Sequence, residues 1–342
     1  MVIVMSPAAA DAELADVVAA IEAGGGKAFV SRGVARTIVG VVAGEDVLGS
    51  LELVGLPGVA EVVRITAPYK LVSRENHART TTVRVGGVPI GPEHFTLIAG
   101  PCAVETPEQT LAGALMAKQA GAALLRGGAY KPRTSPYAFQ GLGVDGLKIL
   151  ADVRSETGMP VVTEIVDAAD VDVVAEYADM LQIGTRNMQN FALLQAVGSI
   201  GKPVMLKRGL TATYEEWLMA AEYIAQRGNL DIVLCERGVR SFEPAIRNML
   251  DVSAVPMVHA LSHLPIIVDP SHAAGRRDLV VPLARAAIAA GADAVMVDVH
   301  PHPETARCDG PQALGGTALD ELAETVATLP GILGRTVTAP RA

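Results

Sequence analysis

The chain has 342 residues and a formal net charge of −9, which argues against a general nucleic-acid-binding surface because such surfaces are basic. Hydrophobic residues make up 50% of the chain and aromatic residues only 4%, so we expect a core of Ala, Val, Leu and Ile, typical of buried parallel strands. No basic segment precedes a long apolar stretch at the start, and later apolar runs are interrupted by Asp and Gly. We therefore predict a soluble cytoplasmic protein with no signal peptide and no membrane partner.

The first 66 residues predict a small α+β domain. Apolar runs at 1–6, 27–33, 36–42 and 59–66 indicate strands, and helical spacing occurs at 11–26 and 45–55. The order βαββαβ is that of a ferredoxin-like unit. Residues 67–94 follow as a polar connector and a hairpin whose turn is Gly86-Gly87. Nothing in this part of the sequence indicates catalysis.

From residue 95 to 342 short apolar runs alternate with Ala-rich helical patterns. We expect strands at 95–100, 122–128, 160–164, 180–184, 203–209, 231–238, 265–272 and 294–301. Eight such units match a (β/α)₈ TIM barrel, for which about 250 residues are typical. An open doubly wound sheet is the alternative, but the chain has no Gly-rich dinucleotide-binding motif after a strand.

Polar residues follow each predicted barrel strand, where a barrel opens onto one face. These strand-end residues are Cys102, Arg126, Glu164, Arg186, Lys207, Arg208, Glu236, Arg237, Asp269, His272, Asp298 and His300. Any one of them taken alone could be a solvated loop residue, but the whole set is better explained by convergence at the barrel mouth.

One subset of these residues is cationic and predicts an anion site. Lys131 and Arg133 of the loop after the second strand add to this subset. The cationic group then comprises Arg126, Lys131, Arg133, Arg186, Lys207 and Arg237. Arg offers bidentate donors and Lys a compact charge, so the group suits more than one phosphate or carboxylate. Gly127 and Gly128 allow close backbone approach to an anion, and Thr134 and Ser135 add hydroxyl donors.

A second subset combines a thiol, an imidazole and two carboxylates: Cys102, His272, Asp298 and Asp309. Such mixed donors suit a divalent transition metal rather than Mg²⁺ or Ca²⁺. No short metal-binding motif accompanies them. Two alternatives stay open, since Cys102 could be a small apolar residue below the mouth and Asp298 could pair with Arg307. The three cysteines cannot form a disulfide framework.

Motifs along the whole chain resemble those of one enzyme family. "IAGPCAVET", "LLRGGAYKPRTSPYAFQGLG", "IIVDPSHAAGRRDLV" and "VDVHPHPETARCDGPQAL" are similar to 3-deoxy-D-arabino-heptulosonate 7-phosphate (DAHP) synthases. The resemblance is to the type Iβ group, which carries an N-terminal ferredoxin-like regulatory domain. The related octulosonate 8-phosphate synthases typically have K-A-N-R-S where this chain has "KPRTS".

The resemblance implies a metal-dependent condensation of phosphoenolpyruvate with erythrose 4-phosphate, the first step of the shikimate pathway. It implies that phosphoenolpyruvate is held by Arg126, Lys131, Arg186, Lys207 and Arg237. It places erythrose 4-phosphate against Pro132, Arg133, Thr134 and Ser135. It assigns Mn²⁺, Zn²⁺, Fe²⁺ or Co²⁺ to Cys102, His272, Asp298 and Asp309. It also suggests a homotetramer inhibited by Tyr or Phe at the N-terminal domain.

Lys131, Cys102 and His272 are the predicted catalytic residues. A substrate alkoxide forms in the condensation, and Lys131 lies where it could protonate that oxygen. We expect the pKa of Lys131 to be lowered by the surrounding cations.

Two positions depart from the family pattern. Asp298 stands where relatives usually have Glu, and we expect retained activity with altered metal affinity. Cys308 stands where Ser is more usual. We favour a neutral exchange at Cys308, and the alternative places a second thiol close to Cys102.

Three functional alternatives remain open from the sequence. The barrel could use another aldose phosphate. It could also be a non-catalytic aromatic amino-acid sensor or scaffold that lost turnover through Asp298. The N-terminal domain could be a simple oligomerisation module.

Overall fold

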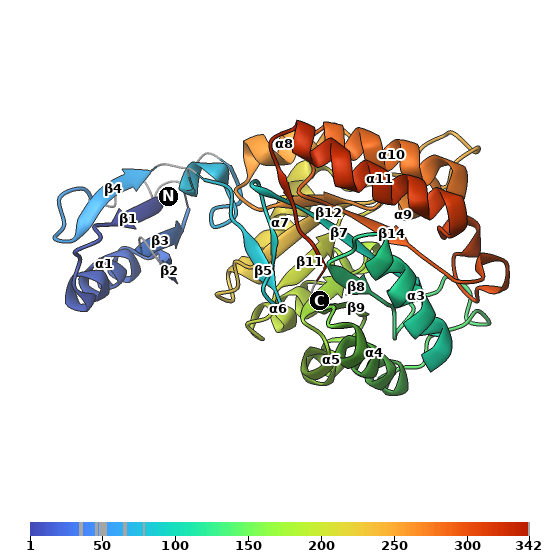
Figure 1. Ribbon diagram of the computed structural model, residues 1–342. Coiled ribbons are helices and arrows are strands. Elements are labelled where there is room, and N and C mark those ends of the chain that lie inside the picture. Colours follow the sequence, from blue (N-terminus) through green and yellow to red (C-terminus); the bar gives the residue numbers. More distant parts are fainter. Residues whose placement is uncertain (34–36, 45–46, 48–52, 64–66, 78, 341–342) are drawn as a thin grey trace.

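The computed structural model describes residues 1–33, 37–44, 47, 53–63, 67–77 and 79–340. Its N-terminal elements form a small layer beside a larger barrel, and the two are joined by the segment that contains β5 (Val83–Val85). The barrel is built from alternating strands and helices, so the predicted α/β fold class is confirmed (Figure 1).

Among the described residues, the N-terminal layer is an antiparallel four-stranded sheet in the order β2-β3-β1-β4. Its strands are β1 (Val2–Met5), β2 (Lys27–Arg32), β3 (Thr37–Val42) and β4 (Val59–Val63). Helix α1 (Asp11–Ala23) buries Leu14, Val17 and Ile21, whose spacing places them on one face. Of residues 45–52 only Val47 is described, so the second predicted helix lies outside the described residues.

Within residues 79–340, eight parallel strands close into a barrel because the last, β14, pairs with the first, β7. The strands are β7 (His94–Gly100), β8 (Leu124–Arg126), β9 (Val161–Ile165), β10 (Met180–Ile183), β11 (Val204–Lys207), β12 (Ile232–Glu236), β13 (Ile266–Val268) and β14 (Ala294–Asp298). Each lies within or next to a predicted run. The open-sheet alternative is therefore wrong.

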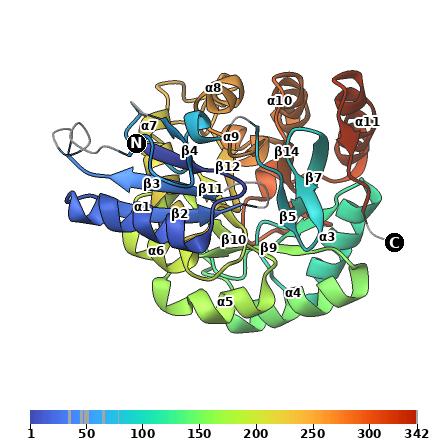
Figure 2. The same ribbon diagram turned by 90° about the vertical axis from the view of Figure 1, so that its left-hand side faces the viewer.

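Helices cover the outside of the barrel (Figure 2). They are α3 (Pro107–Gln119), α4 (Val144–Thr157), α5 (Val171–Tyr177), α6 (Phe191–Gly198), α7 (Tyr214–Ala225), α8 (Ala254–Leu261), α10 (Arg277–Ala289) and α11 (Gly316–Ile332). The short helix α9 (Pro270–Ala274) instead lies at the carboxyl end of β13. Small residues allow close packing: α3 buries Gly113, Ala114 and Ala117 against the sheet. This packing explains how a chain poor in aromatic residues fills its core.

The amino-terminal end of the barrel is closed by the predicted hairpin. Strands β5 and β6 (Val88–Ile90) meet at Gly86 and Gly87, whose φ angles of 53° and 88° suit the tight turn. The apolar side chains of both strands form one cluster with barrel-lining residues such as Met205 and Met296. Short β15 (Thr336–Val337) also pairs with β7. The carboxyl ends of the strands are left as the open end.

The connector before the hairpin is fixed to the barrel by buried polar contacts. Glu222 of α7 accepts backbone N–H groups of Leu71 and Val72 at 2.9 and 3.1 Å. His263, which precedes β13, contacts the Leu71 carbonyl through Nε2 at 2.9 Å and the Thr81 hydroxyl through Nδ1 at 2.7 Å. A neutral ring that donates from Nε2 and accepts at Nδ1 satisfies both contacts.

The buried contacts of His263 predict that the stability of the protein depends on pH. Burial, together with the nearby His77 and Arg74, lowers the pKa of His263 to about 3. The unfolded chain therefore takes up a proton below about pH 6.5 while the native ring stays neutral, so stability is lost as the pH falls from about 6.5 towards 3. We expect His263 to contribute a slope of up to about 1.4 kcal/mol per pH unit to the unfolding free energy.

Urea unfolding followed by the fluorescence of buried Trp217 measures this slope. His263→Gln retains one donor and one acceptor without titrating, so its slope between pH 6.5 and 4 should be smaller than that of the unmodified protein. His302→Gln, at an exposed position, serves as the control. An unchanged slope in His263→Gln would contradict the assignment.

Candidate active site

A cavity of about 510 Å³ lies at the carboxyl ends of the strands. Every residue predicted to contact the two substrates lines it: Arg126, Lys131, Pro132, Arg133, Thr134, Ser135, Arg186, Lys207 and Arg237. His272 and Asp309 of the predicted metal group line it as well. The structure thus brings both predicted subsets to one place.

Six of the predicted strand-end residues do not line this cavity: Cys102, Asp269 and Asp298, which lie in or beside the predicted metal group, and Arg208, Glu236 and His300. Arg208 forms a buried ion pair with Glu236 at 2.9 Å and a second pair with Asp251 at 2.8 Å. His300 lies 3.6 Å from Glu105. Arg208 and Glu236 compensate each other's charge within the protein, and burial lowers the pKa of His300, so these three residues are structural neighbours of the cavity.

The cations on the strand ends are deeply buried and only partly compensated. Arg126, the last residue of β8, contacts the Pro101 carbonyl and Asp298 Oδ1, each at 2.9 Å, yet its Nε has no partner. Arg237, which follows β12, has an unpartnered buried Nη1, and burial lowers its pKa. A buried unpaired donor is costly, so both guanidinium groups suit an incoming anion.

Lys131 belongs to the loop after β8, and its side chain reaches the loop after β7. Its Nζ donates to the Cys102 carbonyl at 2.9 Å and to Cys102 Sγ at 3.1 Å. A Cβ at Gly128 would lie 2.7 Å from that carbonyl and 2.8 Å from Lys131 Cδ, so only glycine allows this approach.

The prediction of a lowered pKa for Lys131 is wrong. Burial alone lowers the pKa of Lys131. Cys102, Cys308 and Glu164 raise it by a larger amount, so the net shift of the pKa is upward. The sequence showed neighbouring cations only, whereas the fold adds two sulfurs and a carboxylate. Lys131 is therefore charged at neutral pH.

The outer rim of the cavity is formed by the exposed part of the same loop. Thr134 and Ser135 are exposed, and Arg186 donates to the Thr134 hydroxyl at 3.3 Å. Arg133 lies deeper and donates from Nη1 to Cys308 Sγ. The cavity therefore has a buried cationic floor and a polar cationic rim, which is the arrangement expected for two anionic groups at different depths.

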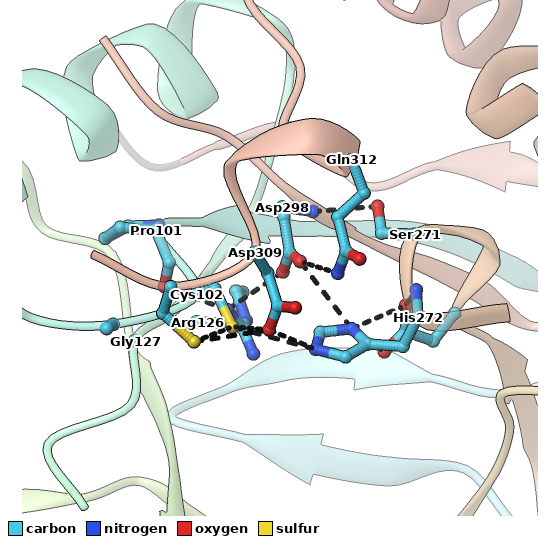
Figure 3. Close-up of polar contacts among 12 residues, drawn as sticks. Pro101, Cys102, Arg126, Gly127, Ser271, His272, Asp298, Asp309 and Gln312 are labelled. Atoms are coloured by element: carbon cyan, nitrogen blue, oxygen red, sulfur yellow. Dashed lines mark hydrogen bonds and ion pairs between the residues drawn. The ribbon is translucent and has the colours of Figure 1, made fainter. Parts of the chain in front are cut away.

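The predicted metal ligands also meet (Figure 3). One donor atom from each of Cys102, His272, Asp298 and Asp309 lies within 4.8 Å of the others. Cys102 Sγ is 3.1 Å from Asp309 Oδ2 and 3.7 Å from His272 Nε2, and those last two atoms are 3.7 Å apart. The mixed sulfur, nitrogen and oxygen donors fit a divalent transition metal.

His272 is oriented by Asp269, the N-cap of α9. Asp269 accepts the backbone N–H of His272 at 2.9 Å, contacts its Nδ1 at 2.9 Å and accepts from Lys207 at 2.5 Å. Burial alone lowers the pKa of His272, but Asp269 and then Asp298 raise it to about 9. With its Nδ1 held by Asp269, the ring turns Nε2 towards Cys102 and Asp309.

Two neighbours of the cluster were missed by sequence reasoning. Gln312 donates to Asp298 Oδ2 at 2.6 Å, and Arg247 pairs with Asp309 Oδ1 at 3.0 Å. Gln312 is fully buried in the segment after Asp309, which no periodic pattern indicates. The suggested pairing of Asp298 with Arg307 is wrong, because Asp298 pairs with Arg126 and Arg307 lies over the Phe139 ring at 3.9 Å.

Comparison with known proteins identifies the class. The model of the DAHP synthetase I family matches residues 72–332, and that of the DAHP synthase ferredoxin-like domain matches residues 1–67. The chain belongs to the DAHP synthetase I family. The predicted family and enzyme class are thus confirmed.

Individual relatives agree with this assignment. A phospho-2-dehydro-3-deoxyheptonate aldolase of Thermotoga maritima is 50% identical over 98% of this chain and 99% of its own length. The crystal structure of a Thermotoga maritima DAHP synthase matches with a TM-score of 0.78 and 49% identity, over 98% of this chain and 99% of the other. A 2-dehydro-3-deoxyphosphooctonate aldolase of Syntrophotalea carbinolica is 35% identical over 73% of this chain and 95% of its own length.

No helix in the described part of the chain has the length and apolar character needed to cross a bilayer.

Replacing Asp269 tests how the cluster is oriented. Asp269→Asn removes the charge that holds His272 Nδ1 and Lys207, so we expect the affinity for Mn²⁺ or Zn²⁺ to fall about 10- to 100-fold. Competition with a chromogenic chelator measures this affinity directly. Asp278→Asn, which removes an exposed carboxylate paired with Arg276, is the matched control. Unchanged affinity in a folded Asp269→Asn variant would contradict the orienting role.

Proposed function

We propose that this protein condenses phosphoenolpyruvate with erythrose 4-phosphate and water to give DAHP and inorganic phosphate, the first step of the shikimate pathway. One observation carries the proposal: buried guanidinium atoms of Arg126 and Arg237 lack partners in the same cavity as a transition-metal type cluster. Membership of the DAHP synthetase I family supports it. The N-terminal match and the 50% identity along nearly the whole chain favour the heptulosonate product over the octulosonate.

The two depths of the cavity support a separate position for each substrate. Phosphoenolpyruvate, with a phosphate and a carboxylate, suits the buried floor of Arg126, Lys207 and Arg237, together with Lys131 and with Arg186 at the edge. Erythrose 4-phosphate suits the rim, where Pro132, Arg133, Thr134 and Ser135 line the same cavity. Cations between two anions reduce their repulsion, and holding both lowers the entropic cost of alignment.

Cys102, His272, Asp298 and Asp309 would hold the divalent metal, which we propose to be Mn²⁺, Zn²⁺, Fe²⁺ or Co²⁺. When bound, such a metal supplies Lewis-acid activation of a substrate oxygen. Cys102 and His272 then take part through the metal, whereas Lys131 acts on the substrate itself.

In the condensation, C3 of phosphoenolpyruvate forms a bond to the aldehyde carbon, whose oxygen gains a negative charge. Lys131 is charged and lies 3.1 Å from Cys102 Sγ, so its Nζ can give a proton to an oxygen held beside the cluster. Water then adds to C2 and releases two protons, one that returns Lys131 to its charged form and one that leaves with the phosphate. The bond from C2 to the phosphate oxygen breaks to leave the ketone and inorganic phosphate. The cationic floor stabilises the departing phosphate.

We further propose that residues 1–66 form a regulatory domain, that 67–94 connect it and that 95–342 form the catalytic barrel. The match to the ferredoxin-like domain of DAHP synthases supports a site there for Tyr or Phe. A homotetramer and a cytoplasmic location belong to the same proposal. The fixed connector, held by Glu222 and His263, supports a route from this domain to the barrel.

Phosphate release is the direct assay of the proposed reaction. We expect release only with phosphoenolpyruvate, erythrose 4-phosphate and a divalent metal together, and no release in excess chelator. Arabinose 5-phosphate in place of erythrose 4-phosphate is the control for the octulosonate alternative. Tight phosphoenolpyruvate binding without release under any metal would instead favour a non-catalytic sensor.

Lys131→Gln separates proton donation from binding. We expect kcat to fall by about 10²- to 10⁴-fold, as is typical for loss of a general acid, with a smaller change in the KM for phosphoenolpyruvate. Lys148→Gln, an exposed exchange on α4, is the control. Unchanged kcat with a raised KM would exclude the acid role.

A further inference from the structure

We infer that Cys308 is an additional metal ligand, so that the site of this chain has two sulfur donors. The inference rests on the proposed metal site and goes beyond the four residues assigned to it. Cys308 lies between the short turns Pro303–Thr305 and Gly310–Gln312, directly before Asp309, and its side chain is buried.

The distances place Cys308 Sγ beside the other donors. It is 3.7 Å from Cys102 Sγ and 3.3 Å from Asp309 Oδ2. Two sulfurs bound to one tetrahedral metal at about 2.3 Å each are separated by about 3.8 Å. Asp309 Oδ2 also lies 3.1 Å from Cys102 Sγ, so one carboxylate oxygen touches both sulfurs. These distances are the ones expected between neighbouring ligand atoms of a single metal ion.

The same two sulfurs are not joined to each other. Both cysteines are free, and their separation of 3.7 Å is far longer than the roughly 2.05 Å of a disulfide. Each sulfur faces a cation: Lys131 donates to Cys102 and Arg133 donates to Cys308. Both sulfurs therefore lie against cations that line the cavity, next to the other donor atoms.

Asp298 leaves room for another donor. Its Oδ1 forms an ion pair with Arg126 at 2.9 Å and its Oδ2 accepts from Gln312 at 2.6 Å, so two neighbours compete with a metal for this carboxylate. Asp298 lies 3.6 Å from Nδ1 of His272, whereas Cys102 and Asp309 lie 3.7 Å from its Nε2. Cys308 contacts Cys102 and Asp309 and so adds a donor next to the Nε2 atom.

A second thiolate changes which metals the site prefers. Soft sulfur ligands favour Zn²⁺ and Co²⁺ relative to Mn²⁺, which prefers oxygen. On this inference, Cys308 shifts the site towards thiophilic metals.

Anaerobic titration with Co²⁺ counts the sulfur ligands through the near-ultraviolet thiolate-to-cobalt charge-transfer band. We expect Cys308→Ser to lower the band per bound Co²⁺ by about twofold, since one of two Co–S bonds is lost. We also expect the Zn²⁺ affinity to fall about tenfold and the Mn²⁺ affinity to change less. Cys308→Ala serves as a second variant should Ser disturb folding.

Cys235→Ala is the matched control, because Cys235 is buried in the apolar cluster inside the barrel and should leave the band unchanged. A band of full intensity in both Cys308 variants would overturn the inference while leaving the metal site intact. Absence of any band in the unmodified protein would overturn the metal site itself, and the inference with it.

Discussion

The buried ion pair between Arg126 and Asp298 joins the two halves of the site. Arg126 belongs to the cationic floor, and Asp298 belongs to the metal-type cluster, where Gln312 fixes its second oxygen. Both side chains are almost fully buried, so each compensates a charge that water does not reach. The pair links the proposed anion site to the proposed metal site. A second pair, Lys207 with Asp269, does the same through His272.

The barrel places such pairs beside a cavity at its carboxyl end. The interior of the amino-terminal end is filled by the β5–β6 hairpin and apolar side chains, and the ion pair of Arg335 with Asp293 at that end does not line the cavity. At the carboxyl end the strands stop, and their last residues reach both a cavity and each other. Backbone contacts at Gly128 bring the loops after β7 and β8 close enough for Lys131 to touch Cys102. Closure of the barrel thus converts residues distant in sequence into one DAHP synthase site.

Much of the fold and part of the site were predictable from the sequence, because the spacing of apolar residues indicates which faces of strands and helices are buried. The eight barrel strands, the Gly86-Gly87 hairpin and the strand-end cations that line the cavity follow from local patterns. The shift of the Lys131 pKa did not follow from local patterns. The direction of this shift depends on Cys102, Cys308 and Glu164, which the fold brings from three other segments. Gln312 and Arg247 were missed for the same reason: they lie in irregular segments, where no periodicity distinguishes a buried contact from a solvated loop.

The central claim is that one cavity places a divalent metal beside the anion-binding floor. Anomalous diffraction from crystals grown with Mn²⁺ and phosphoenolpyruvate tests it most directly. We predict one manganese peak within the cluster of Cys102, His272, Asp298 and Asp309, with the phosphate and carboxylate of phosphoenolpyruvate on Arg126, Lys207 and Arg237. A manganese peak away from these ligands, or phosphoenolpyruvate bound outside the barrel mouth, would contradict the account.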